Sequence, residues 1–406
     1  MRALPLVLAV VLMAASPEAD RSRLDRELDG KVGSLKAKAL KRIEDKLGLT
    51  SPVPEKLVLV FADLPEAKAK ERRIDASDLK EDGGIFTVTL HREFARAGVA
   101  DLEGEATYQL ARAVWRQVYP QRDKVAAWLL HGMALHASGM GDDRVLFIIA
   151  DNEDKTTEIV DGWEEDNKHN ERDQADDILA FRYIEEKFKA EGLKVFLKKV
   201  GEGADPVGLL GADVPGGFKL LEKEWSSRGK EEIEKLAHKG LEGWKALYKK
   251  YQDTPNPDRP DLIDEFHRLI SKGEGCFWES SARYYLGRCL FEAGKEDKAI
   301  LEFQKVLGPL ARRSDPRILD MAKFHLGRLY LERRKNGAAE EAFGLYIRDF
   351  TFGKYQSEAR LELAQMHLEE RKPKEARPLL EWIMAHEPKS DTAEKAAKLL
   401  KELDSK

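Results

Sequence analysis

The feature that most constrains the fold is a pattern that recurs three times in the C-terminal third of the chain. A Leu-Gly or Leu-Ala pair begins at residues 286, 326 and 363, so the copies lie 40 and then 37 residues apart. An alanine follows each leucine, and a large apolar residue follows each alanine, at constant offsets. Such self-similarity is typical of stacked helical units, because a single unit cannot bury its own apolar face. The residues are Leu286, Leu326 and Leu363; Ala299, Ala339 and Ala376; and Phe303, Phe343 and Leu380.

This pattern resembles the tetratricopeptide (TPR) repeat, whose unit of about 34 residues has Leu-Gly, Ala and an aromatic residue at these offsets. Tyr330 and Pro388 fill two further positions of the template. The resemblance implies an α-α superhelix in which small residues let paired helices approach closely. We expect TPR repeats with a C-terminal cap helix over residues 276–406, after a linker and possible degenerate repeat over 231–275.

A TPR array implies a protein or peptide partner in its groove, which the first helix of each pair lines. Two interpretations of the charged residues in these helices remain open. Each arginine with the glutamate four residues later is either an exposed helical ion pair, worth about 0.2–0.5 kcal/mol, or part of a surface that binds a partner's carboxylates. Under both, charge reversal of the arginines is expected to cost little stability. The expected partner-binding residues are Arg288, Phe291, Arg328, Leu331, Gln365 and Leu368.

The N-terminus has the pattern of an export signal. A positive Met1-Arg2 precedes an uncharged run over residues 3–17, which is shorter than the roughly 20 residues of a membrane-spanning helix. The small residues Ala14, Ala15 and Ser16 then resemble a signal-peptidase region. We expect a signal peptide over 1–19 and an exported protein, periplasmic in a bacterium or secreted, without a membrane span.

Composition narrows the function classes. The 69 basic and 74 acidic residues nearly balance, which argues against a nucleic-acid binder. Two cysteines, Cys276 and Cys289, are too few for a disulfide framework or a four-thiolate zinc site. No glycine-rich phosphate motif occurs, and no cofactor is expected. The composition does not specify an oligomeric state.

Between the signal and the repeats, the chain is expected to be mainly α-helical with a small β portion. An amphipathic N-terminal helix over 20–50 is followed by short strands at 57–61 and 85–90. Helical patterns then cover 101–119 and 125–137. The stretch 151–177 has twelve acidic residues against three basic ones and predicts a solvated loop.

Two of these helical patterns, with the segments after them, resemble a gluzincin-type metallopeptidase domain over residues 55–226. In that family an HExxH helix supplies two zinc-binding histidines and a glutamate that activates water, and a following Trp-Leu-x-Glu-Gly-x-Ala helix supplies the third ligand. Here the second helix matches Trp128-Leu129-Leu130-His131-Gly132-Met133-Ala134. The closing part of the domain is matched by Ala175–Phe188, Leu193–Val200 and Glu222–Trp225. The resemblance implies a zincin-like α+β domain over 51–230.

The chain departs from this family at every catalytic position. Tyr108 and Arg112 replace the two histidines, Gln109 replaces the glutamate, and His131 replaces the third ligand. Arginine stays protonated and cannot bind a metal, and glutamine cannot act as a base. The resemblance therefore implies a degenerate domain without metal or catalytic residues. Tyr108, Arg112 and His131 form either a buried polar cluster or, with Gln109, a retained degenerate pocket that binds a ligand.

Other sites have less support. His131 and His136 lie about 140° apart on a helix and are poorly placed to share a metal, with or without His91. The acidic run Glu164–Asp166 fits a solvated face better than a glycosidase pair.

We predict an exported, non-catalytic protein-binding scaffold. The alternatives are a zinc metallopeptidase with atypical ligands, whose repeats recruit substrate, and a structural organiser of the cell envelope.

Overall fold

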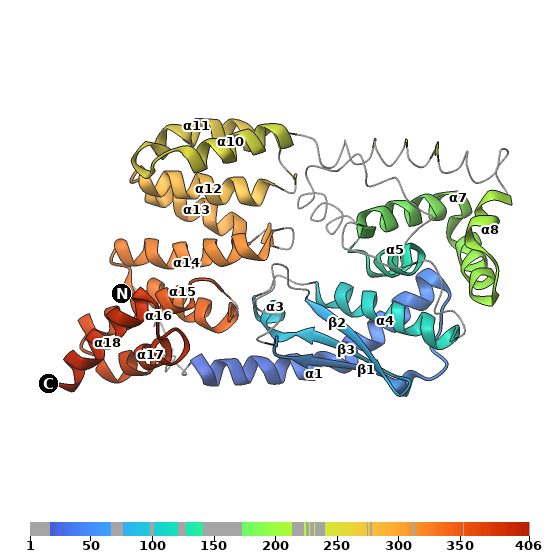
Figure 1. The fold of residues 1–406 in the computed structure, drawn as a ribbon, viewed down its shortest axis with the longest axis horizontal. Helices are drawn as coiled ribbons and strands as arrows, with labels where there is room; N and C mark the ends of the chain where they lie inside the picture. The colour runs from blue at the N-terminus through green and yellow to red at the C-terminus, as the bar shows by residue number, and fades with distance from the viewer. Residues whose placement is uncertain are drawn as a thin grey trace, which may run out of the picture.

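The chain folds into a mainly helical structure with one small sheet (Figure 1), which confirms the predicted fold class at this level. The computed structural model describes residues 17–65, 76–97, 101–120, 127–140, 173–212, 223–224, 227, 231, 240–273, 275–276, 278–308, 310–311, 314–351 and 353–405. Residues 1–16 of the expected signal peptide and 151–172 of the expected acidic loop lie outside this set. The loop prediction is wrong for residues 173–177, which begin a helix.

Helix α1 (Pro17–Leu47) runs along the edge of the N-terminal unit, by which we mean the described elements from α1 to α8. Its 31 residues span roughly 46 Å at about 1.5 Å per residue. It packs against β1, α3, α4, α5 and α7, and its contacts extend to α15 in the C-terminal part of the chain (Figure 1). Ile43 and Leu47 on this helix are buried. One helix therefore touches both parts of the molecule.

The sheet has the strand order β1-β3-β2. The short 3-10 helix η1 (Pro54–Lys56) leads into β1 (Leu57–Ala62), which is parallel to β3 (Ile85–His91). Edge strand β2 (Ser77–Asp82) is antiparallel to β3. Gly83 and Gly84, with φ of 55° and 77°, make the tight turn between them, as a two-residue hairpin loop requires. The sequence prediction missed β2, because its residues SDLKED are polar except for Leu79.

Helices cover the sheet and complete the core of the N-terminal unit. After α3 (Arg92–Ala97), helix α4 (Leu102–Val118) begins at Asp101, whose carboxylate accepts a hydrogen bond from the Gly104 amide. Helix α5 (Ala127–Ser138) corresponds to the helical pattern predicted over 125–137. It packs between α4 and α7 (Asp173–Glu202), and α8 (Pro206–Ala212) follows.

The repeat region, by which we mean α10 to α18, is a succession of helices that pack against their neighbours. Segment 231–275 contains α10 (Leu241–Asp253) and α11 (Ile263–Lys272), and its Pro-rich part forms the 3-10 helix η3 (Asn256–Leu262). Three helical pairs then follow, with bounds that match the three sequence copies. They are α12 (Glu279–Glu292) with α13 (Glu296–Leu307), α14 (Pro316–Glu332) with α15 (Asn336–Asp349), and α16 (Gln356–Glu369) with α17 (Pro373–His386). Helix α18 (Asp391–Asp404) ends the array.

Within the pairs, glycine meets a buried phenylalanine. A Cβ placed on Gly287 would lie 2.6 Å from the ring of Phe303, and one on Gly327 would lie 2.8 Å from that of Phe343. Phe303 also packs against Tyr284 of α12 and His325 of α14. The recurring Leu-Gly and Phe positions thus mark where the helices of a pair touch.

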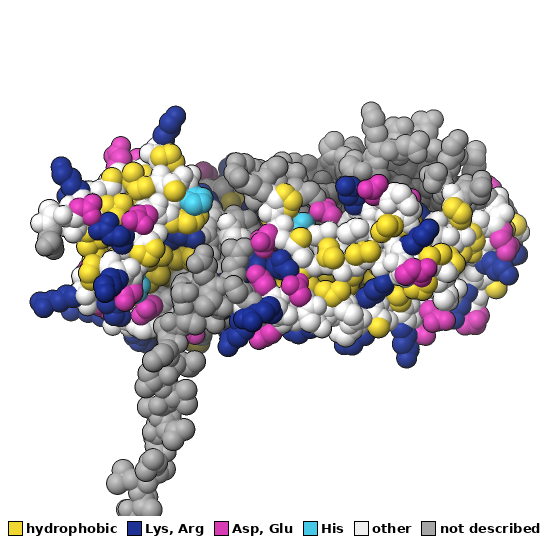
Figure 2. All heavy atoms as spheres, turned by 90° about the horizontal axis from the view of Figure 1, so that it is seen from below, with side chains coloured by type: hydrophobic (Ala, Val, Ile, Leu, Met, Phe, Trp, Pro, Cys, Tyr) yellow, Lys and Arg dark blue, Asp and Glu magenta, His cyan; other side chains and the backbone are white. Residues whose placement is uncertain are grey.

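The face of the molecule shown in Figure 2 carries side chains of several kinds. Over its described part, basic and acidic side chains are interspersed with apolar ones. No helix among the described residues is both long enough and apolar enough to cross a membrane. Cys276 precedes α12 and Cys289 is buried within it, and no disulfide joins the two.

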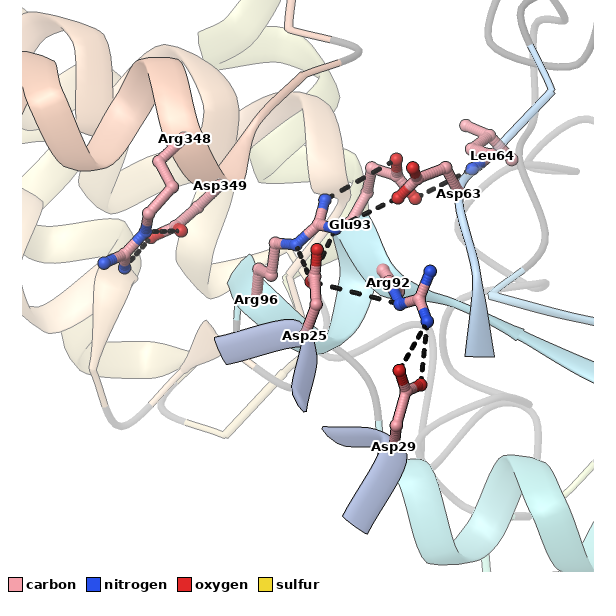
Figure 3. A network of polar contacts seen from close by, with 9 residues as sticks. All are labelled: Asp25, Asp29, Asp63, Leu64, Arg92, Glu93, Arg96, Arg348 and Asp349. Carbon is pink, nitrogen blue, oxygen red and sulfur yellow. Dashed lines mark hydrogen bonds and ion pairs between the residues drawn. The ribbon is translucent and has the colours of Figure 1, made fainter. Parts of the chain in front are cut away.

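A polar network lies where the N-terminal unit meets the repeat region (Figure 3). The Arg96 side chain is fully buried, and its Nε and Nη2 donate to Asp25 Oδ1 of α1 at 2.9 and 2.7 Å. Nη2 also donates to Asp63 Oδ1 at 3.0 Å, just beyond β1. Glu93 lies 3.8 Å from Nη1 and accepts a hydrogen bond from the Leu64 amide. One guanidinium therefore joins α1, α3 and the end of β1.

The positive charge of Arg96 also acts on Asp349 in the repeat region. Helices α1 and α3 both contact α15, which ends at Asp349. Burial raises the pKa of the Asp349 carboxyl, and the positive charges of Arg348, Lys323 and Arg96 oppose that rise. Arg92, which lies four residues before Arg96 on α3, donates a hydrogen bond to Asp29 of α1 at 2.7 Å. These contacts fix the orientation of α3 between α1 and α15.

Replacing Gly287 by alanine is expected to destabilise the protein. The buried Phe303 ring would have to move away from the new methyl group, and overpacking of this kind costs about 1–3 kcal/mol. The matched control is Gly337→Ala in the first turn of α15, where an added Cβ meets nothing within 4 Å. Urea unfolding followed by circular dichroism compares the two variants. Equal stability of Gly287→Ala and Gly337→Ala would contradict this packing.

Replacing Arg96 by methionine is expected to cost about 3 kcal/mol, the lower end of the loss for a broken buried ion pair, because Asp25 and Asp63 keep part of their hydration. The control is Arg377→Met on α17, where Arg377 is 42% exposed and pairs with Asp404. Exposed pairs contribute about 0–1 kcal/mol. Urea unfolding midpoints of the two variants give the comparison. Equal losses would show that the Arg96 network does not support the junction.

Candidate functional site

Three of the four predicted site residues lie on α4 and the fourth on the neighbouring α5. Tyr108 and Arg112 are four residues apart on α4 and share one face of the helix. Helix α4 packs along β2 and against α5, which brings His131 beside this face. The four positions that the peptidase resemblance groups together are thus close in space.

Tyr108 and His131 are in direct contact. The Tyr108 hydroxyl and His131 Nδ1 are 2.6 Å apart and share a hydrogen bond, and their ring centroids are 6.0 Å apart. The Arg112 guanidinium lies over the Tyr108 ring, 5.5 Å from its centroid. Tyr108 is buried, whereas Arg112 and His131 are half-buried. The positions of the three metal ligands in the resemblance therefore hold an aromatic and cationic cluster.

Gln109 faces the sheet. Its amide nitrogen donates to Ser77 of β2, at 3.1 Å to Oγ and 3.3 Å to the carbonyl oxygen, and its Oε1 accepts from Arg112 Nη1 at 3.0 Å. Ser77 Oγ in turn donates to Glu105 Oε2 at 2.6 Å. The result is a chain of hydrogen bonds from Arg112 through the edge strand to a buried carboxylate. We refer to Tyr108, Gln109, Arg112, His131, Ser77 and Glu105 as the α4 cluster.

Sequence reasoning missed Ser77 and Glu105. Glu105 precedes Tyr108 by three residues and Gln109 by four, so helical spacing could have predicted its place on the buried side of α4. Ser77 could not be found in this way, because β2 itself was not predicted. The polar cluster anticipated for Tyr108, Arg112 and His131 thus extends to two further side chains.

The remaining histidines have other partners. His91 Nε2 is 3.0 Å from Asp78 Oδ2, and His136 Nδ1 is 3.2 Å from Glu185 Oε2. Burial lowers the pKa of His136, and the Glu185 carboxylate opposes that effect. Among the described residues, no three His, Cys, Asp or Glu side chains are grouped so that they could hold a metal ion. The run Glu164–Asp166 lies outside the described residues, as do Glu222 and Trp225.

The chemistry available to the α4 cluster is hydrogen bonding and charge. The Arg112 guanidinium is a permanent cation, so a metal ion at the ligand positions would face a fixed positive charge at short range. The Gln109 amide is neutral and is engaged on both its nitrogen and its oxygen. The cluster therefore suits binding of a polar or anionic group better than activation of water on a metal.

In the repeat region, the residues predicted to face the partner differ from one another in exposure. Arg288 has a side chain only 22% exposed, held by Glu292 Oε1 at 3.2 Å and His325 Nε2 at 3.0 Å. The expectation that its charge reversal would cost little stability assumed an exposed side chain. The structure corrects that premise, because the arginine packs against the next repeat. Burial lowers the pKa of His325 well below its ordinary value, and Arg288 and Arg328 lower it further.

The second and third positions remain open to solvent. Arg328 is 41% exposed, 3.6 Å from Glu332 and 3.9 Å from Glu362 of the next repeat. Gln365 is exposed, whereas Phe291, Leu331 and Leu368 are half-buried. Both arginines thus form the i,i+4 pair with a glutamate, and Arg328 also bridges to α16.

Comparisons of the chain with protein-family models, with curated proteins and with solved structures found no match.

Proposed function

We propose that the chain is an exported, non-catalytic scaffold, in which a degenerate metallopeptidase-like unit is joined to TPR repeats that bind a protein or peptide partner. The observation that carries the proposal is the contact between Tyr108 and His131. These residues stand at two ligand positions of the resemblance, they come from separate helices, and they are bound to each other. Arg112 adds a permanent positive charge at the third ligand position.

The repeats supply the second part of the proposal. The close approach of Gly287 to Phe303 and of Gly327 to Phe343 fits the paired helices of a TPR array. We place the partner on the exposed side of α14 and α16, where Arg328, Glu332, Gln365 and Glu369 are accessible. Arg288 contributes to this surface indirectly, through its contacts with His325 and Glu292. Export to the periplasm or the medium rests on the N-terminal sequence pattern.

The partner surface predicts a selective loss of binding. Arg328→Glu is expected to lower partner capture at least tenfold, because it leaves three carboxylates together at residues 328, 332 and 362 and repels the group that Arg328 attracted. The matched control is Arg377→Glu. Arg377 is 42% exposed and also has a glutamate four residues later, Glu381, but it lies on the second helix of a pair.

The measurement is quantitative mass spectrometry of proteins retained from a cell-envelope extract by immobilised mature protein. The proposal predicts a protein that wild type and Arg377→Glu capture equally and that Arg328→Glu does not. Equal capture by all three folded proteins would remove this face as the binding surface.

A further inference from the structure

Arg112 differs from the other inward-placed arginines of the N-terminal unit. Arg42, Arg92, Arg96 and Arg116 each pair with a carboxylate, from Glu103, Asp29, Asp25 and Glu81 respectively. Arg112 forms no ion pair with any described carboxylate, and its one hydrogen bond to a described residue goes to the neutral Gln109 amide. Its Nε is buried and has no hydrogen-bond partner among the described residues. Within this part of the chain, a half-buried cation is thus left without a counter-charge.

This arrangement is costly for the free protein. A charge that loses water without gaining an ion partner is unfavourable, and nearby hydrogen bonds to neutral groups offset only part of that cost. The Tyr108 ring under the guanidinium supplies a cation–π contact, which offsets a further part of that cost. An anionic ligand would supply the missing partner, and sites that lose stability for the sake of function are common in proteins.

The neighbours of Arg112 favour one class of anion. Guanidinium donors match the two oxygens of a carboxylate, and such pairs are stronger than neutral hydrogen bonds. A phosphate ester carries about −1.5 to −2 charges, and more than one cation is needed to neutralise it. Arg112 is the one permanent cation of the α4 cluster, and Glu105 already adds a carboxylate to that cluster. A single negative charge is the better fit.

We propose that Arg112 binds a carboxylate of a ligand, with the hydrogen-bonded Tyr108 and His131 side chains beside it. This site lies in the N-terminal unit, apart from the repeats, and goes beyond the partner surface proposed above. The carboxylate is either the free C-terminus of a peptide or a small organic acid. Both offer the same planar anion to the guanidinium.

The test compares the thermal unfolding of the mature protein with three probes at constant ionic strength, with sodium chloride as reference. The probes are N-acetyl-trialanine, its C-terminal amide, and acetate. The proposal expects N-acetyl-trialanine to raise the Tm by several degrees and the amide to have no effect, because a ligand that binds only the folded state stabilises it. If acetate acts equally, a small acid suffices. If it does not, the site requires a peptide C-terminus.

Variants at Arg112 make the test specific. Arg112→Met is expected to abolish the response to N-acetyl-trialanine and to raise the Tm of the free protein by about 2–4 °C, the shift for about 1 kcal/mol in a unit of this size. Arg112→Lys keeps the charge but loses the planar guanidinium that donates two parallel hydrogen bonds to a carboxylate. It is expected to weaken binding of N-acetyl-trialanine about tenfold. The matched control is Arg116→Met, one helical turn further along α4, which removes an arginine that already pairs with Glu81.

The outcomes separate clearly. Loss of the response in Arg112→Met with an unchanged response in Arg116→Met supports the site. The proposal is overturned if no carboxylate stabilises the wild-type protein beyond sodium chloride, or if Arg112→Met responds as the wild type does. Neither result bears on capture by the repeats, which the Arg328 variants test separately.

Discussion

The arrangement of the molecule depends on the contacts that the buried guanidinium of Arg96 makes. Burying a cation is costly unless carboxylates and hydrogen bonds compensate its charge, and here the carboxylates come from α1, from the end of β1 and from α3 itself. Satisfying this one charge fixes three elements at once, and two of them contact α15. The elements that Arg96 joins thus include the two helices through which the N-terminal unit contacts α15 of the repeat region.

The repeat region was largely predictable from the sequence, because its packing depends on residues that recur. Gly287 and Phe303 are informative since close helix approach and a filling ring leave a pattern at constant spacing. The N-terminal unit was less predictable. Strand β2 has only Leu79 as an apolar residue and is held by main-chain pairing with β3, which leaves little signal in a local window. Helix α3 is short, and Glu93 and Arg96 are charged residues buried in it beside Phe94. Their burial depends on partners far away in the chain.

The candidate sites show the same limit. The spacing of α4 and α5 within the resemblance was sufficient to bring Tyr108, Arg112 and His131 together. The hydrogen bonds of Gln109 were not predictable, since their partner Ser77 lies on the missed strand. Arg288 was assigned to an open groove by counting along one helix, yet His325 of the following repeat encloses it. Periodicity predicts which face of a helix a residue occupies, but not how closely the next element covers that face.

Our central proposal is that Tyr108, Arg112 and His131 occupy the positions that hold the metal ligands in the peptidase resemblance. It is tested most directly by rebuilding the site. Tyr108→His with Arg112→His, beside the native His131, supplies three histidines with the i,i+4 spacing that zinc sites use. Elemental mass spectrometry after zinc loading and desalting measures the metal, and a zinc-dependent rise in Tm confirms that it binds the folded protein. The account predicts one zinc per chain in the double variant and no stoichiometric zinc in the wild type. A folded double variant that retains no zinc, or zinc bound to the wild type, would contradict it.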